Sequence, residues 1–377
     1  MNNLLTDTQK EIVTMAAKFA AKEIAPIVEA DEKNSYFRRE LFYKLGEAGL
    51  LGITADPEWG GTGLGTLEYS LLLEELAYYS GGYAVSVSVT NLPQSIIDKF
   101  GIREQKEKYI PDIVSGKKIG AFALTEPSSG SDATGIKMKA EKKDGFYILN
   151  GVKQFITNGE FADIFIVIAR TNTEHRSKGT SAFIVEKNTP GLRGGKLEKK
   201  MGMRVSPTQE MIFENVKVPE KNLLAQEGMG IQIPFTALDS GRLSIASIAN
   251  GISRAALDRA HKYSKEREQF GKPIFDFQGV SFLLADMATE LEASRSLMRT
   301  AAMLKDAGHP FTLQASMAKL HATEACMRIT TDAVQILGGY GYMEDYIVER
   351  YMREAKMLQI VEGTSQIQRL VISKNLN

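Results

Sequence analysis

Apolar residues recur along the chain with different spacings, and the changes in spacing divide it into three zones. In the first zone, roughly residues 1–117, they recur every three to four positions, which is typical of amphipathic helices. Thr6 followed three residues later by Gln9 fits a capping box, and Leu67–Tyr79 predicts another helix. The apolar face after the capping box comprises Ile12, Met15, Ala16 and Phe19.

In the second zone, about residues 118–228, the spacing becomes that of β-strands. Phe146–Leu149 leads into Asn150-Gly151, the strongest short hairpin signal, and the chain continues as Val152–Thr157. We therefore expect a small antiparallel β-domain with a turn at Asn150-Gly151. Further strands are predicted at Ile164–Ile168, Ala182–Val185 and Met211–Val218.

The third zone, residues 229–377, returns to long helices with a narrow apolar stripe and charged residues elsewhere, which suits a helix bundle. The predicted fold class is therefore α+β and mainly α, with an N-terminal helical domain, a middle β-domain and a C-terminal bundle. The stripe comprises Val280, Leu284, Met287, Leu291 and Met298.

Composition excludes several classes of function. The 46 basic residues equal the 46 acidic ones, so no basic field draws the chain to nucleic acid. Cys326 is the only cysteine, and the four histidines lack a spacing such as HExxH, so no metal site is expected. Neither a signal peptide nor an apolar run of roughly 18 residues is evident, so we expect a cytoplasmic protein that does not bind membranes.

Near the C-terminus one carboxylate, Glu362, stands among apolar neighbours and directly before a glycine. Loss of hydration beside Ile360 and Val361 is expected to raise its pKa and make it a stronger base toward a weakly acidic C–H group. Gly363 permits a close backbone approach to a ligand, and Thr364–Gln366 supply hydrogen-bonding groups. The alternative is a frayed helix end with a surface glutamate.

Two segments of the β-zone are candidates for holding a planar ring. Phe122–Ser131 leaves a strand and enters a polar loop whose N–H groups and hydroxyls suit the acceptor edge of such a ring. Phe155–Thr157 places an aromatic residue and a hydroxyl at a strand end, where stacking on a cofactor and simple core packing are equally open.

Two segments of the third zone offer further candidates. Arg267 follows a predicted helix, where it either grips a phosphate or satisfies the helix dipole. Gln335–Tyr342 combines glycines with an amide, but it is not GxGxxG after a strand, so a Rossmann site is not supported.

In this order and on this helix–sheet–helix plan, five segments resemble the acyl-CoA dehydrogenases, and the resemblance spans essentially the whole chain. Each motif is modest alone, whereas their joint order is specific. The segments are Phe122–Ser131, Phe155–Thr157, Asp239–Arg242, Gln335–Gly339 with Arg267 and Gln278 before it, and Glu362–Gln366.

The resemblance implies domains at 1–117, 118–228 and 229–377, the last a four-helix bundle, and FAD bound between the β-domain and the C-terminal helices. Phe122, Leu124, Thr125, Gly130, Ser131, Phe155, Ile156 and Thr157 would contact the isoalloxazine ring. Arg267, Phe270, Gln278, Gln335, Ile336, Leu337, Gly338 and Gly339 would reach the FAD of a neighbouring subunit, and Thr364, Ser365 and Gln366 would complete the site. Ser131, Asp239, Ser240, Gly241, Arg242 and Gly363 would meet the acyl-CoA.

The resemblance also implies a reaction. Glu362 would take the α-proton of an acyl-CoA thioester while the β-hydrogen leaves as hydride to the flavin, and electrons would pass to an electron-transferring flavoprotein. Members are homotetramers or occasionally dimers. A filled position 362 and a non-acidic Gly241 indicate the short- and medium-chain, butyryl-like branch.

Several alternatives stay open at this stage. Val361 stands where a tyrosine commonly precedes the glutamate, so bulkier, branched or cyclic acyl groups compete with short ones. Asn91 lies in the Val87–Gln94 stretch expected near the acyl pocket. The rival functions are an enoyl-CoA reductase that runs the reverse reaction, an oxidase, and a non-catalytic acyl-CoA-binding flavoprotein.

Overall fold

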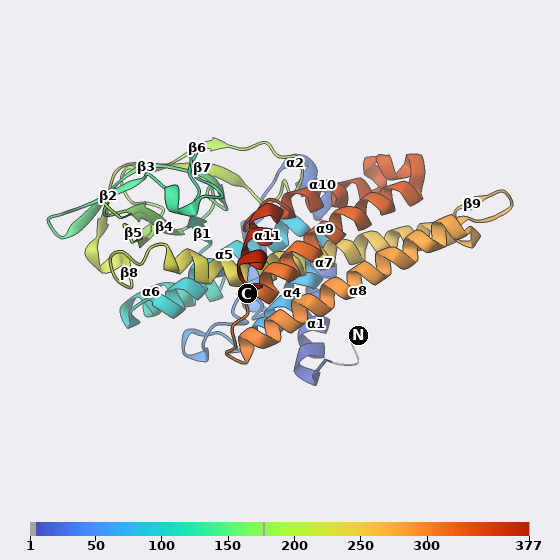
Figure 1. Cartoon of the computed structure of the whole chain (residues 1–377), viewed down its shortest axis with the longest axis horizontal. Helices are drawn as coiled ribbons and strands as arrows, with labels where there is room; N and C mark the ends of the chain where they lie inside the picture. Colours follow the sequence, from blue (N-terminus) through green and yellow to red (C-terminus); the bar gives the residue numbers. More distant parts are fainter. Residues whose placement is uncertain (1–4, 176–177, 377) are drawn as a thin grey trace.

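A computed structural model describes residues 5–175 and 178–376 and places a β-sheet at one end of a largely helical body (Figure 1). The mainly helical α+β fold class predicted from the sequence is confirmed. No helix in these two ranges is long and apolar enough to cross a membrane. The helices before the sheet are α1 (Asp7–Phe19), α2 (Val28–Asn34), α3 (Arg39–Glu47), α4 (Thr66–Tyr79), α5 (Gly81–Phe100) and α6 (Arg103–Val114).

Local capping signals explain where these helices begin. The Thr6 side chain accepts from the Gln9 N–H at 3.3 Å, and the Gln9 side chain accepts from the Thr6 N–H, so the predicted capping box is present. On the predicted apolar face Ile12 and Ala16 are buried, whereas Met15 stays exposed. Helix α4 is capped from a distance, because the Asp306 carboxylate accepts from the N–H groups of its first two residues.

The sheet is mixed rather than purely antiparallel. Its strands lie in the order β6-β7-β3-β2-β4-β5-β8, and β1 pairs in parallel with β4. The antiparallel prediction therefore fails at β4, which pairs in parallel with β1 and, at Lys139 and Arg170, with β2. The strands are β1 (Gly120–Ala123), β2 (Lys139–Lys143), β3 (Phe146–Thr157), β4 (Ile164–Arg170), β5 (Thr180–Glu186), β6 (Leu192–Leu197), β7 (Thr208–Pro219) and β8 (Leu223–Leu224).

The predicted hairpin turn at Asn150-Gly151 is wrong. Both residues lie inside β3, where the pairing with β7 shifts register between Leu149 and Gly151. The hairpin between β2 and β3 instead turns at Asp144-Gly145, whose φ angles of 48° and 79° suit a tight turn with two left-handed residues. The glycine at 151 thus serves an irregularity within a strand.

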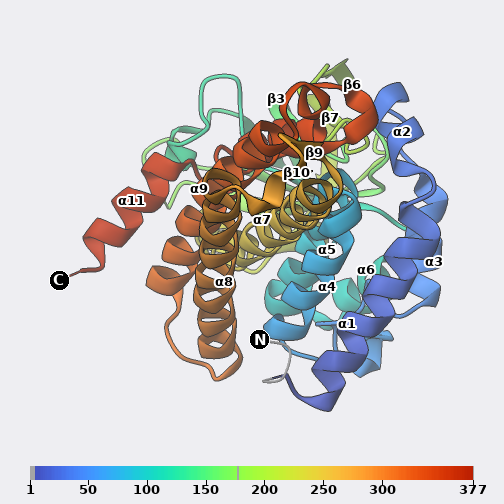
Figure 2. The same cartoon turned by 90° about the vertical axis from the view of Figure 1, so that its right-hand side faces the viewer.

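The C-terminal zone forms the predicted bundle of long helices, which run side by side in Figure 2. Of the predicted stripe on α8, four residues are buried and Val280 is partly buried against the same core. The elements are α7 (Gln232–Glu266), a hairpin of β9 (Glu268–Gln269) and β10 (Lys272–Pro273), α8 (Gln278–Asp306), α9 (Thr312–Leu337), α10 (Val348–Leu358) and α11 (Ser365–Lys374).

One apolar core joins the N-terminal helices to the bundle, because buried residues of α1, α3, α4, α5, α7, α8 and α9 belong to a single cluster. A second cluster lies between α5, α6 and one face of the sheet, and a third covers the opposite face. The sheet is therefore docked on the helical body through α5 and α6.

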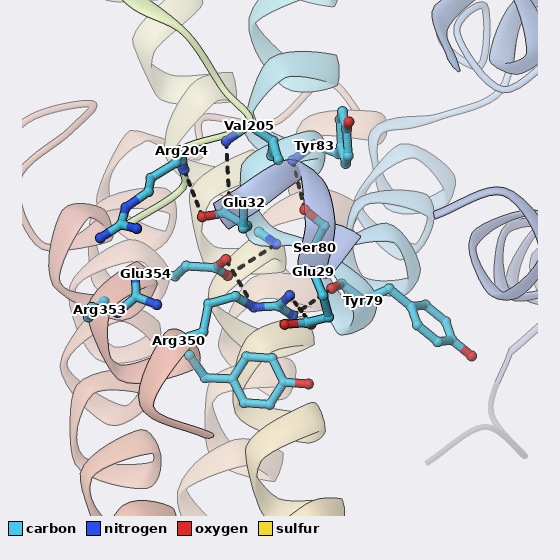
Figure 3. Close-up of polar contacts among 12 residues, drawn as sticks. Glu29, Glu32, Tyr79, Ser80, Tyr83, Arg204, Val205, Arg350, Arg353 and Glu354 are labelled. Atoms are coloured by element: carbon cyan, nitrogen blue, oxygen red, sulfur yellow. Dashed lines mark hydrogen bonds and ion pairs between the residues drawn. The ribbon is translucent and has the colours of Figure 1, made fainter. Parts of the chain in front are cut away.

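A polar cluster at the N-terminal end of α5 also attaches the sheet to the helical body (Figure 3). Glu32 on α2 accepts hydrogen bonds from the backbone N–H groups of Arg204 and Val205, at 3.0 and 3.2 Å. These two residues lie between β6 and β7, so a carboxylate of the first zone fixes a loop of the second.

In the same cluster α10 is tied to α2 and α5. Glu354 is fully buried and accepts from the Gly81 N–H at 3.3 Å. Arg350 pairs with Glu29 at 2.5 Å and donates to the Tyr79 carbonyl at 2.9 Å. All three zones therefore meet at one polar centre.

Replacing Glu354 by glutamine tests this centre. Burial raises the pKa of Glu354 to about 8, whereas an unfolded glutamate titrates near ~4.3. Between these values the folded chain holds a proton that the unfolded chain has released, so stability falls as the pH rises through this window. We expect E354Q to flatten the fall in the free energy of unfolding between about pH 5 and pH 8.

Denaturant titrations across this pH range measure the effect. Glu214, which is 62% exposed and paired with Arg193, offers a matched control, and E214Q should leave the slope unchanged. Equal slopes for wild type and E354Q would contradict a protonated, buried Glu354.

Candidate functional site

A cavity of about 530 Å³ lies between helices α4, α5 and α7, and Glu362 forms part of its wall. Several residues of the Val87–Gln94 stretch, which was expected near the acyl pocket, line this cavity. The main lining residues are Thr66, Tyr69 and Ser70 of α4, Ser88, Asn91, Leu92 and Gln94 of α5, Asp239, Ser240 and Gly241 of α7, and Glu362.

Glu362 lies in the short turn between α10 and α11 and has an unusual backbone conformation. Its φ angle is 52°, and that of Gly363 is 88°, so two consecutive residues are left-handed. Such a conformation is costly for a residue with a side chain and persists where neighbours enforce it. Lys319 of α9 donates to the Gly363 carbonyl at 2.8 Å, and Gln368 of α11 donates to the carbonyls of Glu362 and Gly363 at 3.0 and 2.9 Å.

The carboxylate of Glu362 packs against the glycine of α7. A Cβ atom at Gly241 would lie 2.6 Å from Glu362 Oε2, so a larger residue there would displace the carboxylate. Oε2 is inaccessible and has no hydrogen-bond partner among the described residues. Burial raises the pKa of Glu362 to about 7, against the opposing charges of Lys319 and Arg242.

The source of this burial differs from the sequence expectation. Ile360 is 55% exposed, and Val361 packs partly against the helical core and does not line the cavity. The carboxylate instead packs against Gly241 of α7, which is distant in sequence.

The segment Asp239–Arg242 on α7 is split by its helical geometry. Asp239, Ser240 and Gly241 line the cavity. Arg242 is buried, does not line it, and donates to Asp239 and to Ser316 of α9. The positive charge of Arg242 nevertheless lowers the pKa of the Glu362 carboxylate.

The two segments expected at a flavin ring lie side by side on the sheet. The N–H of Gln154 donates to the Thr125 carbonyl at 2.8 Å, and the buried Lys153 donates to the Leu124 carbonyl at 2.8 Å. Lys153 also pairs with Glu126 at 2.9 Å, which fixes the loop from inside. The exposed residues of this area include Phe155, which is 61% exposed with φ of 58°, Gly130 and Ser131.

A second hollow, of about 480 Å³, contains the other expected cofactor residues. It is lined by Arg267 and by Ile336–Gly339, which meet at the end of the bundle that carries the β9–β10 hairpin. Three further expected cofactor residues do not line this hollow. Gln278 and Gln335 are exposed, and Phe270 at the hairpin tip is 93% exposed.

These two areas lie far apart within one chain. Figure 1 shows the β9–β10 hairpin at one end of the longest axis and the sheet at the other. Thr364–Gln366 directly follow the Glu362 turn: Thr364 caps α11, Ser365 donates to Glu324 at 2.6 Å, and Gln366 is exposed. A single chain therefore does not bring all the expected cofactor residues together.

Sequence reasoning missed two residues that shape the turn, Lys319 and Gln368. Lys319 is fully buried although lysine is normally a surface residue. A signal was present, because its neighbours on the same face of α9, Ala315, Ala322 and Thr323, are small and uncharged.

Models of one family match the three zones. The N-terminal, middle and C-terminal domains of acyl-CoA dehydrogenase match residues 6–117, 121–216 and 228–377. An acyl-CoA dehydrogenase of Bacillus subtilis (strain 168) is 50% identical over 372 residues, with 98% of each chain covered. An acryloyl-CoA reductase (NADH) of Anaerotignum propionicum is 44% identical over 378 residues, covering 100% of this chain and 96% of the reductase.

Solved structures indicate the same family. Butyryl-CoA dehydrogenase from Megasphaera elsdenii superposes with a TM-score of 0.97 at 46% identity, covering 99% of this chain and 98% of that one. A chain from work on the electron transferring flavoprotein of Acidaminococcus fermentans and flavin-based electron bifurcation superposes with a TM-score of 0.98 at 49% identity, covering 100% and 99%. The chain belongs to the acyl-CoA dehydrogenase family, whose members are FAD flavoproteins.

Proposed function

We propose that the protein catalyses the FAD-dependent α,β-dehydrogenation of an acyl-CoA thioester to the trans-2-enoyl-CoA, with Glu362 as the base. The observation that carries this proposal is the Glu362 carboxylate on the cavity wall, with an inaccessible Oε2 that lacks a partner. A base of raised pKa in a cavity is suited to removing a weakly acidic proton near neutral pH.

The chain's own residues support each part of this role. The cavity between α4, α5 and α7 receives the acyl group and keeps water from the reacting carbon. The Glu362 side chain accepts the α-proton at Oε2, and the Glu362 N–H donates to the thioester carbonyl, where it stabilises the developing enolate charge. Lys319 and Gln368 hold this turn in place through its two carbonyls.

The residues on the sheet fit a flavin. Phe155 is exposed beside the polar loop, and a Cβ at Gly130 would meet nothing within 4 Å, so a planar group has access there. Leu124, Thr125 and Ser131 would hold it from the loop side, with Phe155 and Thr157 from β3. When bound, FAD supplies the acceptor for the β-hydrogen and its electron pair.

The hairpin area would complete the cofactor site of a second copy. One hollow, at the end of the helical bundle far from the sheet, is lined by Arg267 and Ile336–Gly339. Only another subunit can therefore bring these residues to the sheet residues. We propose a homotetramer on this basis. The same end carries exposed apolar residues that an interface would cover, namely Phe270, Phe282, Tyr340, Tyr342 and Met343.

We propose that electrons pass to an electron-transferring flavoprotein, which the similarity to the chain studied with the flavoprotein of Acidaminococcus fermentans supports. The acyl group is short, by similarity to butyryl-CoA dehydrogenase. The buried free thiol of Cys326 suits a cytoplasmic location. The similarity to acryloyl-CoA reductase supports a second candidate, reduction of an enoyl-CoA at the same site.

Anaerobic titration of the FAD-loaded protein with straight, branched and cyclic acyl-CoA thioesters tests the proposal. Flavin absorbance should bleach with at least one saturated thioester, and enoyl-CoA should form in equal amount. Absence of bleaching with every saturated thioester, together with reoxidation of the reduced flavin by enoyl-CoA, would favour the reductase.

Replacing Glu362 by glutamine should abolish turnover and spare cofactor binding. Glutamine keeps the shape of the side chain but cannot accept the proton, so we expect kcat to fall by roughly 10²- to 10⁴-fold or more. FAD content, measured by absorbance, should match wild type. Near-normal turnover of E362Q would remove Glu362 from the mechanism.

Replacing Lys319 by methionine should move the pH profile as well as the rate. Because Lys319 lowers the pKa of Glu362, its loss should shift the rise of kcat with pH to higher pH. Arg242 remains as the second cation near the carboxylate.

The matched control is Gln368→Leu, which removes two hydrogen bonds to the same turn without removing a charge. Q368L should lower kcat and leave the midpoint of the profile in place. An unshifted profile in K319M would show that Lys319 acts on the turn by geometry alone.

A further inference from the structure

The inner wall of the cavity is more polar than an alkyl chain requires. Tyr69 and Ser70 reach it from α4, and Ser88, Asn91 and Gln94 reach it from α5. The α5 residues are spaced by three, so they lie along one face of that helix. The Tyr69 hydroxyl faces the side chains of Ser88 and Asn91, so these groups gather at one place.

Most of these polar groups are buried without a partner. Asn91 is 5% exposed, and Gln94 and Ser70 are each 1% exposed. Gln94 Oε1 and Ser70 Oγ have no hydrogen-bond partner among the described residues, and at Asn91 the Tyr69 hydroxyl can satisfy at most one of the two polar atoms of the side chain. A buried polar group left in this state typically costs about 1–3 kcal/mol, so several together are expected to serve a ligand.

The wall contrasts with a neighbouring serine on the same helix. Ser95 also lines the cavity, but its hydroxyl donates to the Leu92 carbonyl at 3.0 Å and is satisfied within α5. Pro93 lacks an N–H, so the carbonyl of Val89, another lining residue, loses its usual donor in the helix. The unpartnered groups are thus concentrated at Asn91 and its neighbours.

The polar wall itself is uncharged. Apart from Glu362, the acidic residues around the cavity are engaged: Asp98 pairs with Lys106 at 3.5 Å, Asp306 caps α4, and Asp239 accepts from Arg242. Two cations, Lys99 and Lys305, also line the cavity, but Lys99 follows Asn91 by eight residues, about 12 Å along α5. A neutral wall that offers both donors and acceptors matches a neutral group that does the same. An ionised group held at Asn91 would lose hydration, and the polar residues of α4 and α5 around Asn91 offer it no opposite charge.

We propose that the acyl group carries an uncharged hydrogen-bonding substituent, a hydroxyl or an amide, beyond its β-carbon, and that Asn91 is its main contact. This inference rests on the proposed function, because it places the thioester carbon at Glu362 and the rest of the acyl group along α5. The apolar lining residues Leu92 and Leu243 contact the carbons in between.

Binding to the inactive E362Q holoprotein tests the inference without turnover. Calorimetry would compare butyryl-CoA with 4-hydroxybutyryl-CoA and hexanoyl-CoA with 6-hydroxyhexanoyl-CoA. We expect the hydroxyl to strengthen binding by about 10-fold or more in at least one pair, the effect of satisfying one buried polar group. Wild-type kcat/KM should show the same preference.

Asn91→Leu, which keeps the size of the side chain and removes its polar atoms, should reverse the preference. The matched control, Ser95→Ala, removes a hydroxyl that is already satisfied and should leave the ratio between the two substrates unchanged. Tighter binding of the alkyl member in both pairs, equal shifts in N91L and S95A, or a preference for the ionised succinyl-CoA would each overturn the inference.

The outcomes distinguish a failure of the substituent preference from a failure of the proposed dehydrogenase activity. If alkyl thioesters bleach the flavin and are preferred over their hydroxylated counterparts, the proposed dehydrogenase stands and the inference on the substituent falls. If no thioester of either kind bleaches the flavin, the proposed function falls with it.

Discussion

The left-handed turn at Glu362 is the constraint on which the site depends. Its φ of 52° is unfavourable for glutamate, and it is enforced by Lys319 and Gln368, which bond the carbonyls of Glu362 and Gly363. The turn aims the carboxylate over Gly241, where only the absence of a side chain leaves room. The same few contacts thus set the position of the Glu362 carboxylate, its desolvation and the positive charge near it.

The fold explains how this turn is kept rigid. Helix α9, which carries Lys319, and helix α7, which carries Gly241, share one apolar core with the N-terminal helices that form the rest of the cavity wall. The sheet is docked separately, through α5 and α6 and through the polar centre around Glu32 and Glu354 (Figure 3). The acyl cavity therefore lies within the helical body, while the proposed cofactor surface belongs to the sheet and to a second copy of the chain.

Local signals in the sequence were sufficient for much of the fold. The capping box at Thr6 and the apolar stripe on α8 depend on neighbours three or four residues away, and both are present. The prediction of a turn at Asn150-Gly151 failed because the same dipeptide also suits an irregularity within a strand. Only the pairing of β3 with β7 decides between the two.

The site was predictable in part. Glu362 was identified from its own segment, yet the reason given was incomplete, because Ile360 is exposed and the carboxylate packs against Gly241 of α7. Lys319 is 43 residues before Glu362, and no local pattern connects the two. Asn91 was placed near the pocket, but its lack of partners became visible only when α4 and α5 were brought together.

The most direct measurement of the central claim is proton exchange at the α-carbon. A thioester whose β-carbon is replaced by sulfur cannot release hydride, so with the FAD-loaded protein in D₂O only abstraction and return of the α-proton are followed, by mass spectrometry. The account predicts that wild type incorporates deuterium at this carbon and that E362Q does not above the rate in buffer. Equal incorporation by the two proteins would contradict it.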